Sequence, residues 1–462
     1  MINNFLGIKL QKLSLLEKMW LLAPLVIWFS YQPLLSLWQD NTAYYELSIP
    51  LIYLVLLGVV GVPAIWRARQ MLAKQGVVWL TSAFVGYGLL SLLWTPNALR
   101  GILTIGIVGL LFLVFLAALA EQARLRRLIP ILARLLIGSA VIMSLLAFVQ
   151  VFAGIWLSRS EALLCAGCIA DQFGFVRPNV FAIEPQFFGS LLLAPLLILL
   201  SMIVKDDRSK YAICSFLLLS TALFLTLSRG AIFAFAIGAL VLFVMHYRKW
   251  AAVMRSVSIL ALAFATTLLI QGAAAAVNPR LDTRFMGAIS ASIEQLSLGL
   301  IDIPVEPQAP RTGDEKTLPA YDGYVEESTN VRLSLSSLAL GTWSDTPARI
   351  AFGVGAGGAG IAMHERYVNQ VGTREIVQNQ YIEVLLEYGL VGFALFTAVI
   401  VGFVYRTRRD WLAWALMAAY LVQWSFFSGY PNALHIYLVL IAIFAANKQV
   451  LSSGRRVGAV QT

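Results

Sequence analysis

Long apolar runs separated by short polar connections make up most of this chain. Runs of about 18 or more nearly uncharged residues recur along it, and each can cross a hydrocarbon core of about 30 Å as a helix. Inside a bilayer the backbone finds no water partners, so helices are the expected structure. The apolar positions also lack the strict alternation of an outer-membrane barrel. The pattern therefore predicts an all-α polytopic membrane protein.

We expect about twelve transmembrane helices, since each apolar run is long enough for one crossing. The seventh and eighth are separated only by Ser228, Arg229 and Gly230, which predicts a tight connection. The expected spans are residues 19–38, 47–66, 76–94, 101–119, 129–153, 187–204, 211–228, 230–247, 256–272, 380–405, 411–428 and 435–447.

Composition agrees with a membrane protein and excludes an ordinary soluble domain. The 462 residues are 59% hydrophobic and 13% charged, against about 45–50% and about 25% in typical soluble domains. A soluble protein could not bury this apolar surplus. Lys9, Lys12 and Lys18 precede the first run without a cleavable signal pattern, which predicts that the first span is retained.

Clusters of three basic residues fall in alternate connections between the apolar runs. The seven clusters hold 21 of the 34 Lys and Arg residues, and only five acidic residues share their side. The positive-inside rule places that side in the cytoplasm, together with both termini. The net charge of +10 is then mainly a topology signal and gives no reason to expect a nucleic-acid partner. The clusters are Lys9, Lys12, Lys18; Arg67, Arg69, Lys74; Arg124, Arg126, Arg127; Lys205, Arg208, Lys210; Arg248, Lys249, Arg255; Arg406, Arg408, Arg409; and Lys448, Arg455, Arg456.

The spans and loops divide the chain into four parts. They are residues 1–272, with helices 1–9, short loops and an outer loop at about 154–186; residues 273–379, a large periplasmic loop between helices 9 and 10; residues 380–447, with helices 10–12; and residues 448–462, a cytoplasmic tail.

The large loop has a Pro-, Asp- and Glu-rich middle between more ordered flanks. Val331–Leu340 has the apolar spacing of a helix, and Gly360–Val371 fits a short amphipathic helix at the membrane surface. Gly353–Gly358 matches a nucleotide-binding string, but no strand of a dinucleotide fold precedes it, so we expect a flexible or tight turn. Cys165 and Cys168 form a CxxC in the first outer loop, and the sequence leaves open whether they are disulfide-bonded.

Three outer arginines stand apart from the basic clusters. Arg177 precedes the sixth span, Arg229 lies at the tip of a tight connection, and Arg332 lies ahead of the glycine-rich turn. A guanidinium is a planar, always charged fork that suits phosphate oxygens. The ordinary alternative for each is an interfacial residue that contacts lipid headgroups.

Glu383 and Glu387 lie one helical turn apart near the outer end of the tenth span. Carboxylates at membrane depth are costly and normally face the bundle interior or a wet cavity. One interpretation is a polar pocket in which these carboxylates face the arginines. The other is that they fix helix packing.

Four segments together resemble the O-antigen ligase and O-antigen polymerase superfamily. The run Gln378–Gly392 is similar to its signature, which reads His-Asn-x-Tyr-Leu-Glu and then Glu-x-Gly-Leu-x-Gly. The resemblance covers most of residues 170–405. The other segments are Thr226–Ala231, similar to its Ser-Arg-Gly motif; Arg177 with Pro178-Asn179 and Glu184-Pro185, similar to its Arg…Glu-Pro-Asn stretch; and Arg332 with Thr346-Pro347 and Gly353-Val354-Gly355, similar to its Arg…Asp-x-Pro…Gly-x-Gly stretch.

The resemblance implies a GT-C-like, metal-independent glycosyltransferase without a cofactor, acting at the periplasmic face of the bacterial inner membrane. Its donor would be a glycan linked to undecaprenyl diphosphate, and its surroundings the lipid bilayer; whether a chain-length regulator binds is left open. Preorganised arginines would stabilise the charge of the leaving diphosphate. The implied diphosphate-binding residues are Arg177, Arg229, Arg332, Asn379 and Tyr381, and the catalytic candidates are Glu383, Gln378, Glu184 and Glu387.

One position departs from the ligase pattern. The ligases carry His where this chain has Gln378, and a glutamine amide does not accept a proton near neutral pH. Either the base is another residue, or deprotonation is not the role of this position across the family. Glu383, Glu387 and Glu184 are the candidates for the base, with His364 and His435 as outer-face alternatives. The departure favours a repeat-unit polymerase, for O-antigen or exopolysaccharide, over a ligase that uses a lipid A–core acceptor. A transporter or flippase is the alternative from another class, although the large loop breaks the two-half symmetry expected there.

Overall fold

The computed structural model describes residues 13–30, 33–39, 44–157, 171–172, 175–182, 184–205, 209–277, 327–368, 370–427 and 433–447. Cys165 and Cys168, the middle of the large loop and the predicted cytoplasmic tail lie outside the described residues.

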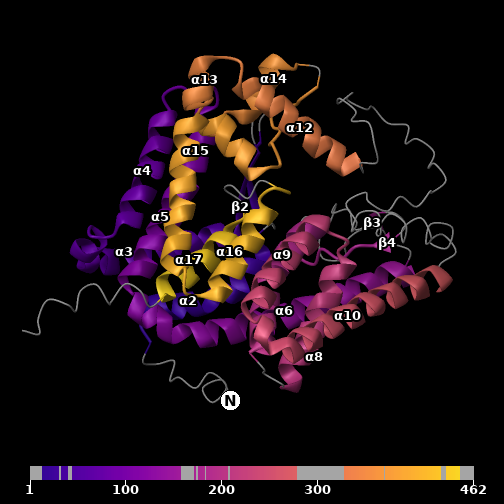
Figure 1. Cartoon of the computed structure of the whole chain (residues 1–462). Helices are drawn as coiled ribbons and strands as arrows, with labels where there is room; N and C mark the ends of the chain where they lie inside the picture. Colours follow the sequence, from indigo (N-terminus) through magenta and orange to yellow (C-terminus); the bar gives the residue numbers. More distant parts are fainter. Residues whose placement is uncertain are drawn as a thin grey trace, which may run out of the picture.

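The regular secondary structure of the described residues is helical apart from two short antiparallel ribbons, β1–β2 and β3–β4 (Figure 1). The ribbons are β1 (Pro33–Gln39) with β2 (Tyr44–Ser48) and β3 (Asp171–Gln172) with β4 (Phe175–Val176). The helices are α2 (Leu15–Val26), η2 (Ile27–Phe29), α3 (Ile49–Leu72), α4 (Gly76–Ser91), α5 (Ala98–Ala120), α6 (Gln122–Leu157), α7 (Pro185–Val204), α8 (Lys210–Leu225), α9 (Arg229–Met245), η3 (Tyr247–Lys249), α10 (Trp250–Val277), α12 (Glu327–Trp343), α13 (Pro347–Phe352), α14 (Ala359–Arg366), α15 (Gln380–Thr407), α16 (Trp411–Gln423) and α17 (Leu434–Ala446).

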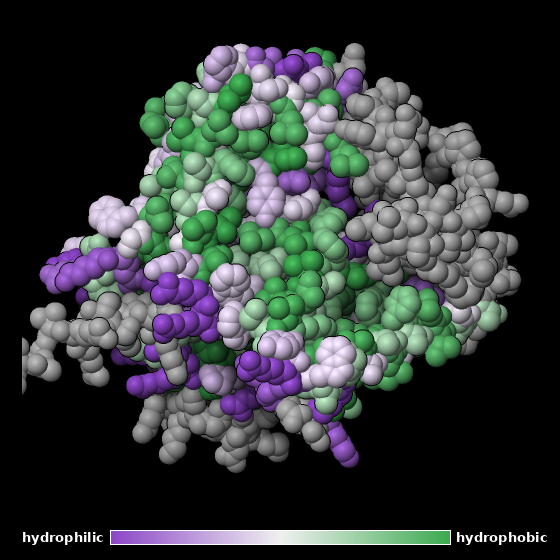
Figure 2. Space-filling model, viewed as in Figure 1, coloured by the Kyte–Doolittle hydropathy of each residue, from purple (hydrophilic) through white to green (hydrophobic). Residues whose placement is uncertain are grey.

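The all-α membrane architecture is confirmed in its main features. Among the described residues, six helices are long and apolar enough to cross a membrane, namely α3, α5, α6, α7, the stretch that contains α10, and α15. The helices α4, α8, α9, α16 and α17 are apolar but shorter. Figure 2 shows the corresponding surface, with an apolar band between hydrophilic residues at two ends. The count of twelve crossings and the side of each loop stay predictions.

The prediction of one helix over the first expected span, residues 19–38, is wrong for the second half of that span. Helix α2 and the turn η2 end at Phe29, and Pro33–Gln39 is a strand paired with Tyr44–Ser48. Proline cannot donate the backbone hydrogen bond that a helix needs and disfavours a helical residue before it, so the apolar run around Pro33 does not continue as a helix. Apolar composition alone did not distinguish strand from helix there.

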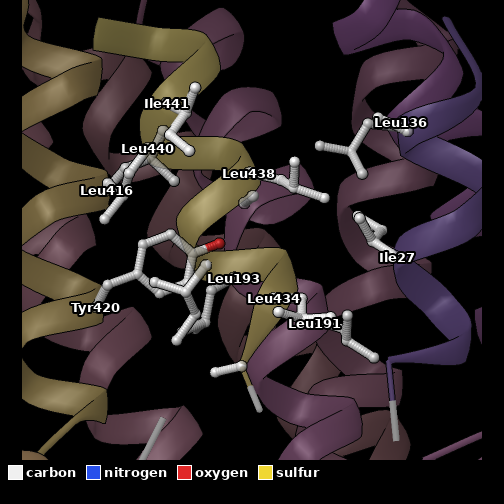
Figure 3. Close-up of a cluster of buried hydrophobic side chains, with 14 of the residues drawn as sticks. Ile27, Leu136, Leu191, Leu193, Leu416, Tyr420, Leu434, Leu438, Leu440 and Ile441 are labelled. Carbon is white, nitrogen blue, oxygen red and sulfur yellow. The ribbon is translucent and has the colours of Figure 1, made fainter. Parts of the chain in front are cut away.

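Helix α7 lies at the centre of the bundle. Of the most apolar stretch of α7, 83% is buried inside the protein. The helix contacts α6, α8, α9, α10, α16 and α17. Figure 3 shows Leu191 and Leu193 of α7 beside Leu416 and Tyr420 of α16 and Leu434 of α17. The helices therefore share one apolar core, in which α7 is enclosed by its neighbours.

Three of the predicted basic clusters gather at one end of the bundle. Arg67 and Arg124 both lie near the Glu121 carboxylate, at 3.6 and 3.3 Å. Arg406, at the end of α15, donates to Gln75 Oε1 at 2.9 Å, just before α4. The ends of α3 and α15 thus meet the α5–α6 connection, as expected if these loops share one side of a membrane.

The opposite end of α4 and α5 carries a small subdomain built from the large loop. Helices α12 and α14 pack with the first two turns of α15 around their own apolar core, and α13 packs against α15 (Figure 1). The helical flank predicted at Val331–Leu340 is confirmed as part of α12. The helix predicted at Gly360–Val371 is present but shorter, because α14 ends at Arg366.

Helix α15 is broken at Gly389, where the backbone has φ 61°. The glycine-rich turn fills the break: Val354 N donates to Leu386 O at 2.9 Å and Gly355 N donates to Glu387 O at 2.8 Å. A Cβ at Gly389 would lie 2.5 Å from the Ala351 carbonyl. The turn is therefore tight, and the break needs a residue without a side chain.

Gly389→Ala should destabilise the protein for two reasons. The alanine would have to adopt a left-handed backbone conformation, and its Cβ would clash with the backbone of Ala351 in α13. The expected loss is about 2 kcal/mol or more of unfolding free energy, seen as a lower apparent melting temperature in detergent. Gly106→Ala is the matched control: Gly106 lies inside α5, and a Cβ added there would meet no atom within 4 Å, so its melting temperature should hold or rise. Equal effects of the two substitutions would contradict the role of the break.

Candidate active site

Helix α15 begins against the turn that ends α16, Trp424–Phe427, which we name the α16 turn. Gln380 N donates to Trp424 O at 2.9 Å, and Asn379 Nδ2 donates to Ser425 O at 3.2 Å. The segment that resembles the family signature is thus bound to the α16 turn at its first residues. Helices α7 and α9 also begin beside the α16 turn.

Helices α7 and α9 reach the α16 turn through Gln186 and Gly230. Gln186 Nε2 donates to Phe426 O at 3.0 Å. A Cβ at Gly230 would lie 2.7 Å from Phe426 Cβ, so α9 approaches as closely as a glycine allows. The starts of α7, α9 and α15 therefore converge, and helix starts carry partial positive charge.

Arg332 of α12 joins two of these starts. Its Nη2 donates to Gln186 Oε1 at 2.6 Å and its Nε donates to Gln378 Oε1 at 3.3 Å. We name Arg332, Gln186 and Gln378 the Arg332 cluster. Its members come from three segments far apart in the sequence, and the amide of Gln186 uses its oxygen for Arg332 and its nitrogen for Phe426.

Arg177 holds the connection between α8 and α9. Its Nε donates to Thr226 O at 2.7 Å and its Nη2 donates to Leu227 O at 3.3 Å. These carbonyls immediately precede Ser228, which caps α9, and Arg229, its first residue. Arg177 therefore lies against the connection that leads to Arg229.

The Arg177 segment is anchored in turn by Gln150 of α6. Gln150 Oε1 accepts from the backbone N–H groups of Asn179 and Val180 at 3.1 and 3.0 Å, and its Nε2 donates to Asn179 Oδ1 at 2.6 Å. Both Gln150 and Asn179 are buried. Sequence reasoning missed Gln150 and Gln186, although a lone glutamine in or beside an apolar span is the signal that would have found them.

Strained backbone marks the same region. Among the described residues, the non-glycine positions with positive φ are Val180 at 52°, Leu227 at 48° and Gln378 at 55°. Gln378 is itself a candidate site residue, Val180 follows Arg177 by three positions, and Leu227 precedes Arg229 by two. Such conformations are costly, most of all for a β-branched residue such as Val180, and they persist only where surrounding contacts hold them.

The predicted carboxylates occupy three different environments. Glu387 lies near the Glu383 carboxylate, Arg100 and the backbone N–H groups of Gly357 and Ala359. Its place beside the glycine-rich turn and the start of α14 supports the packing interpretation for this residue. Glu383 is buried in the first turn of α15, and Glu184 is exposed just before α7.

Two other residues of the signature make structural contacts. Asn379 Oδ1 caps α15 by accepting from the N–H groups of Tyr381 and Ile382 at 3.1 and 3.3 Å. The Tyr381 hydroxyl donates to Leu421 O at 2.6 Å. Their predicted part in substrate binding stays a prediction.

The two alternative histidines lie apart from the Arg332 cluster. His364 Nδ1 and Val371 O are 2.6 Å apart within the loop subdomain. His435 is buried between helices, and its Nε2 shares a hydrogen bond of 3.0 Å with Ser190 Oγ. In the described part of the chain, His, Cys, Asp and Glu side chains form no group of three that could hold a metal ion.

The fold defines a multi-pass α-helical membrane protein. Residues 214–397 match the family model of the O-antigen ligase, which confirms the resemblance to the O-antigen ligase and polymerase superfamily. Arg229, Arg332, Gln378 and Glu383 lie inside the matched range, whereas Arg177 precedes it. No curated protein matches the chain.

Gln150→Leu should loosen the Arg177 segment while leaving the bundle intact. The backbone amides of Asn179 and Val180 lose their hydrogen-bond acceptor. Loss of a buried hydrogen bond costs about 1–3 kcal/mol. These amides should therefore exchange their hydrogens about tenfold faster or more. Hydrogen–deuterium exchange of peptides that contain these amides measures the change. Leu145→Ala, at an exposed position of the same helix, should leave their exchange as in the wild type; equal exchange in both variants would contradict the anchor.

Proposed function

We propose that this protein is a polysaccharide repeat-unit polymerase of the bacterial inner membrane. It transfers a glycan from undecaprenyl diphosphate to an acceptor hydroxyl of another lipid-linked unit at the periplasmic face. The family match supports a glycosyltransferase that acts on lipid-linked polysaccharide. An O-antigen ligase is the alternative within the same class.

The Arg332 cluster is the observation that carries this proposal. A charged guanidinium is hydrogen-bonded to Gln186 and Gln378 beside the starts of three helices. Helix starts and arginines both stabilise negative charge, and both are recurrent partners of phosphate. A lipid diphosphate at the membrane surface is a substrate that suits this concentration of positive potential.

The chemistry requires stabilisation of a leaving group and removal of one proton. The bond from the anomeric carbon to the diphosphate oxygen breaks, and the electron pair leaves with the diphosphate. Arg229 and Arg332 would stabilise the growing negative charge in a partly dehydrated site. The acceptor oxygen forms the new glycosidic bond, and a base takes its proton.

Gln378 serves as an acceptor for Arg332 in this scheme, and the base is a carboxylate. The Oε1 atom of Gln378 accepts from the guanidinium, and a glutamine amide has no basic site. Glu383 and Glu184 are the candidates, because Glu387 is engaged by the glycine-rich turn. A base other than the ligase histidine supports polymerase over ligase.

Arg229→Ala and Arg177→Ala should abolish long-chain glycan in cells while the protein remains inserted. Arg229→Ala removes a phosphate contact, and Arg177→Ala removes the donor that holds the Thr226 and Leu227 carbonyls. A polysaccharide gel measures chain length, and size-exclusion chromatography in detergent reports folding. Arg349→Ala is the control, because Arg349 pairs with exposed Asp345 at 2.9 Å and should give a normal ladder. Normal ladders from both site variants would disprove the diphosphate-binding role.

Purified protein with the lipid-diphosphate repeat unit alone should yield longer lipid-linked glycan. A polymerase finds donor and acceptor in the same substrate, whereas a ligase needs a second acceptor. Thin-layer chromatography or mass spectrometry follows the products. Product only after addition of lipid A–core would identify a ligase, and no transfer under either condition would favour a transporter.

A further inference from the structure

Five polar side chains are enclosed between α15, α16 and α17, next to the Arg332 cluster. Gln380 and Gln423 are both 0% exposed and Trp424 is 3% exposed. The backbone N–H of Gln380 donates to Trp424 O at 2.9 Å, and the rings of Trp424 and Tyr437 are 5.9 Å apart. Tyr420, one turn before Trp424, is also buried, and Figure 3 shows its hydroxyl in the interior of the bundle. We name these five residues the buried polar cluster.

The polar atoms of this cluster have no hydrogen-bond partner within the described part of the chain. They are both amide atoms of Gln380, both amide atoms of Gln423, the indole Nε1 of Trp424, and the hydroxyls of Tyr420 and Tyr437. Buried polar groups are almost always satisfied, since each one left without a partner is costly. Seven such atoms in one place would remove a large part of a protein's stability. They therefore need a ligand.

The chemistry of these atoms matches water. Indole and amide nitrogens donate, amide oxygens accept, and tyrosine hydroxyls do both, while none of the five side chains is charged. Internal waters typically make about three hydrogen bonds to mixed donors and acceptors of this kind. An ion or a sugar phosphate would call for charged partners.

The location of the cluster connects the candidate site to a carboxylate. Gln380 lies two residues after Gln378, and Glu383 follows one helical turn later on α15. The Tyr437 hydroxyl lies within electrostatic range of Glu383. Water held here would therefore extend from the Arg332 cluster to the buried carboxylate.

We propose that the buried polar cluster binds ordered water, and that this water carries the acceptor's proton to Glu383. As the acceptor oxygen bonds to the anomeric carbon, its proton passes to a water molecule, which passes one of its own to the Glu383 carboxylate. The electron pair of the broken bond leaves on the diphosphate, and Glu383 releases the proton after turnover. The relay rests on the proposed function, whereas the water site does not.

X-ray hydroxyl-radical footprinting tests the water site on the purified full chain. Radicals formed from bound water label aromatic side chains that bulk solvent does not reach. Trp424 should be labelled several-fold faster than Trp28, which is 1% exposed but has its Nε1 bonded to Ser139 Oγ at 2.9 Å. Equal labelling of the two tryptophans would overturn the inference.

Gln423→Leu tests the relay, with Gln380→Leu as a second variant should the first fail to insert. We expect slower labelling of Trp424 and a kcat for glycan elongation lower by about tenfold or more, since positioned proton transfer contributes about 10²–10⁴. The KM for the lipid-linked unit should not change. Thr221→Val is the control, because that buried hydroxyl is satisfied by Leu217 O within its own helix.

The outcomes separate the relay from the function. If Trp424 is labelled in the wild-type protein but the protein does not elongate glycan, the water site is supported and the proposed function is disproved. Elongation without labelling of Trp424 overturns the water site and leaves the function standing. Gln423→Leu protein that loses the label but elongates at the wild-type rate overturns the relay.

Discussion

A helix that ends or breaks at membrane depth leaves backbone groups that only the protein can satisfy, and this constraint shapes the whole site. At the break in α15, Val354 and Gly355 supply N–H groups to the carbonyls of Leu386 and Glu387. Between α8 and α9, Arg177 supplies the donors. Between α6 and α7, Gln150 supplies the acceptor. These partners stabilise the irregular backbone that carries the candidate residues.

The same constraint gives several side chains two tasks. Arg177 satisfies the carbonyls of Thr226 and Leu227 before Arg229, so under the proposed function it would act on an anionic substrate partly through the position of that neighbour. Gln186 satisfies the α16 turn with its nitrogen and orients Arg332 with its oxygen. Under the proposed function, a substitution at such a residue would change local stability and substrate contacts together, so folding controls matter more here than at a half-buried arginine away from the Arg332 cluster, such as Arg349.

Hydropathy and charge predicted most of the helices because both are properties of single segments. The two helices joined by the short connection at Ser228 and the helical flank at Val331–Leu340 were found in this way. The strand at Pro33–Gln39 and the break at Gly389 were not, because both depend on other parts of the chain: one on pairing with Tyr44–Ser48, the other on the backbone of Ala351. The motifs include Arg177, Arg229 and Arg332, but Gln150 and Gln186 belong to no motif. A lone Gln150 within an apolar run signals a buried polar contact, and its role follows only once its partner Asn179 is known.

Position 378 separates two properties that a histidine combines. A neutral histidine offers a ring nitrogen that accepts a hydrogen bond, and it can also take up a proton. Glutamine keeps the first property and loses the second. Since Gln378 accepts from Arg332, a glutamine at this position keeps the contact to the arginine, and under the proposed function the proton acceptor lies elsewhere. Under the proposed function, the nearest buried carboxylate on the same helix is Glu383, so the substitution and the buried polar cluster lead to the same residue from independent observations.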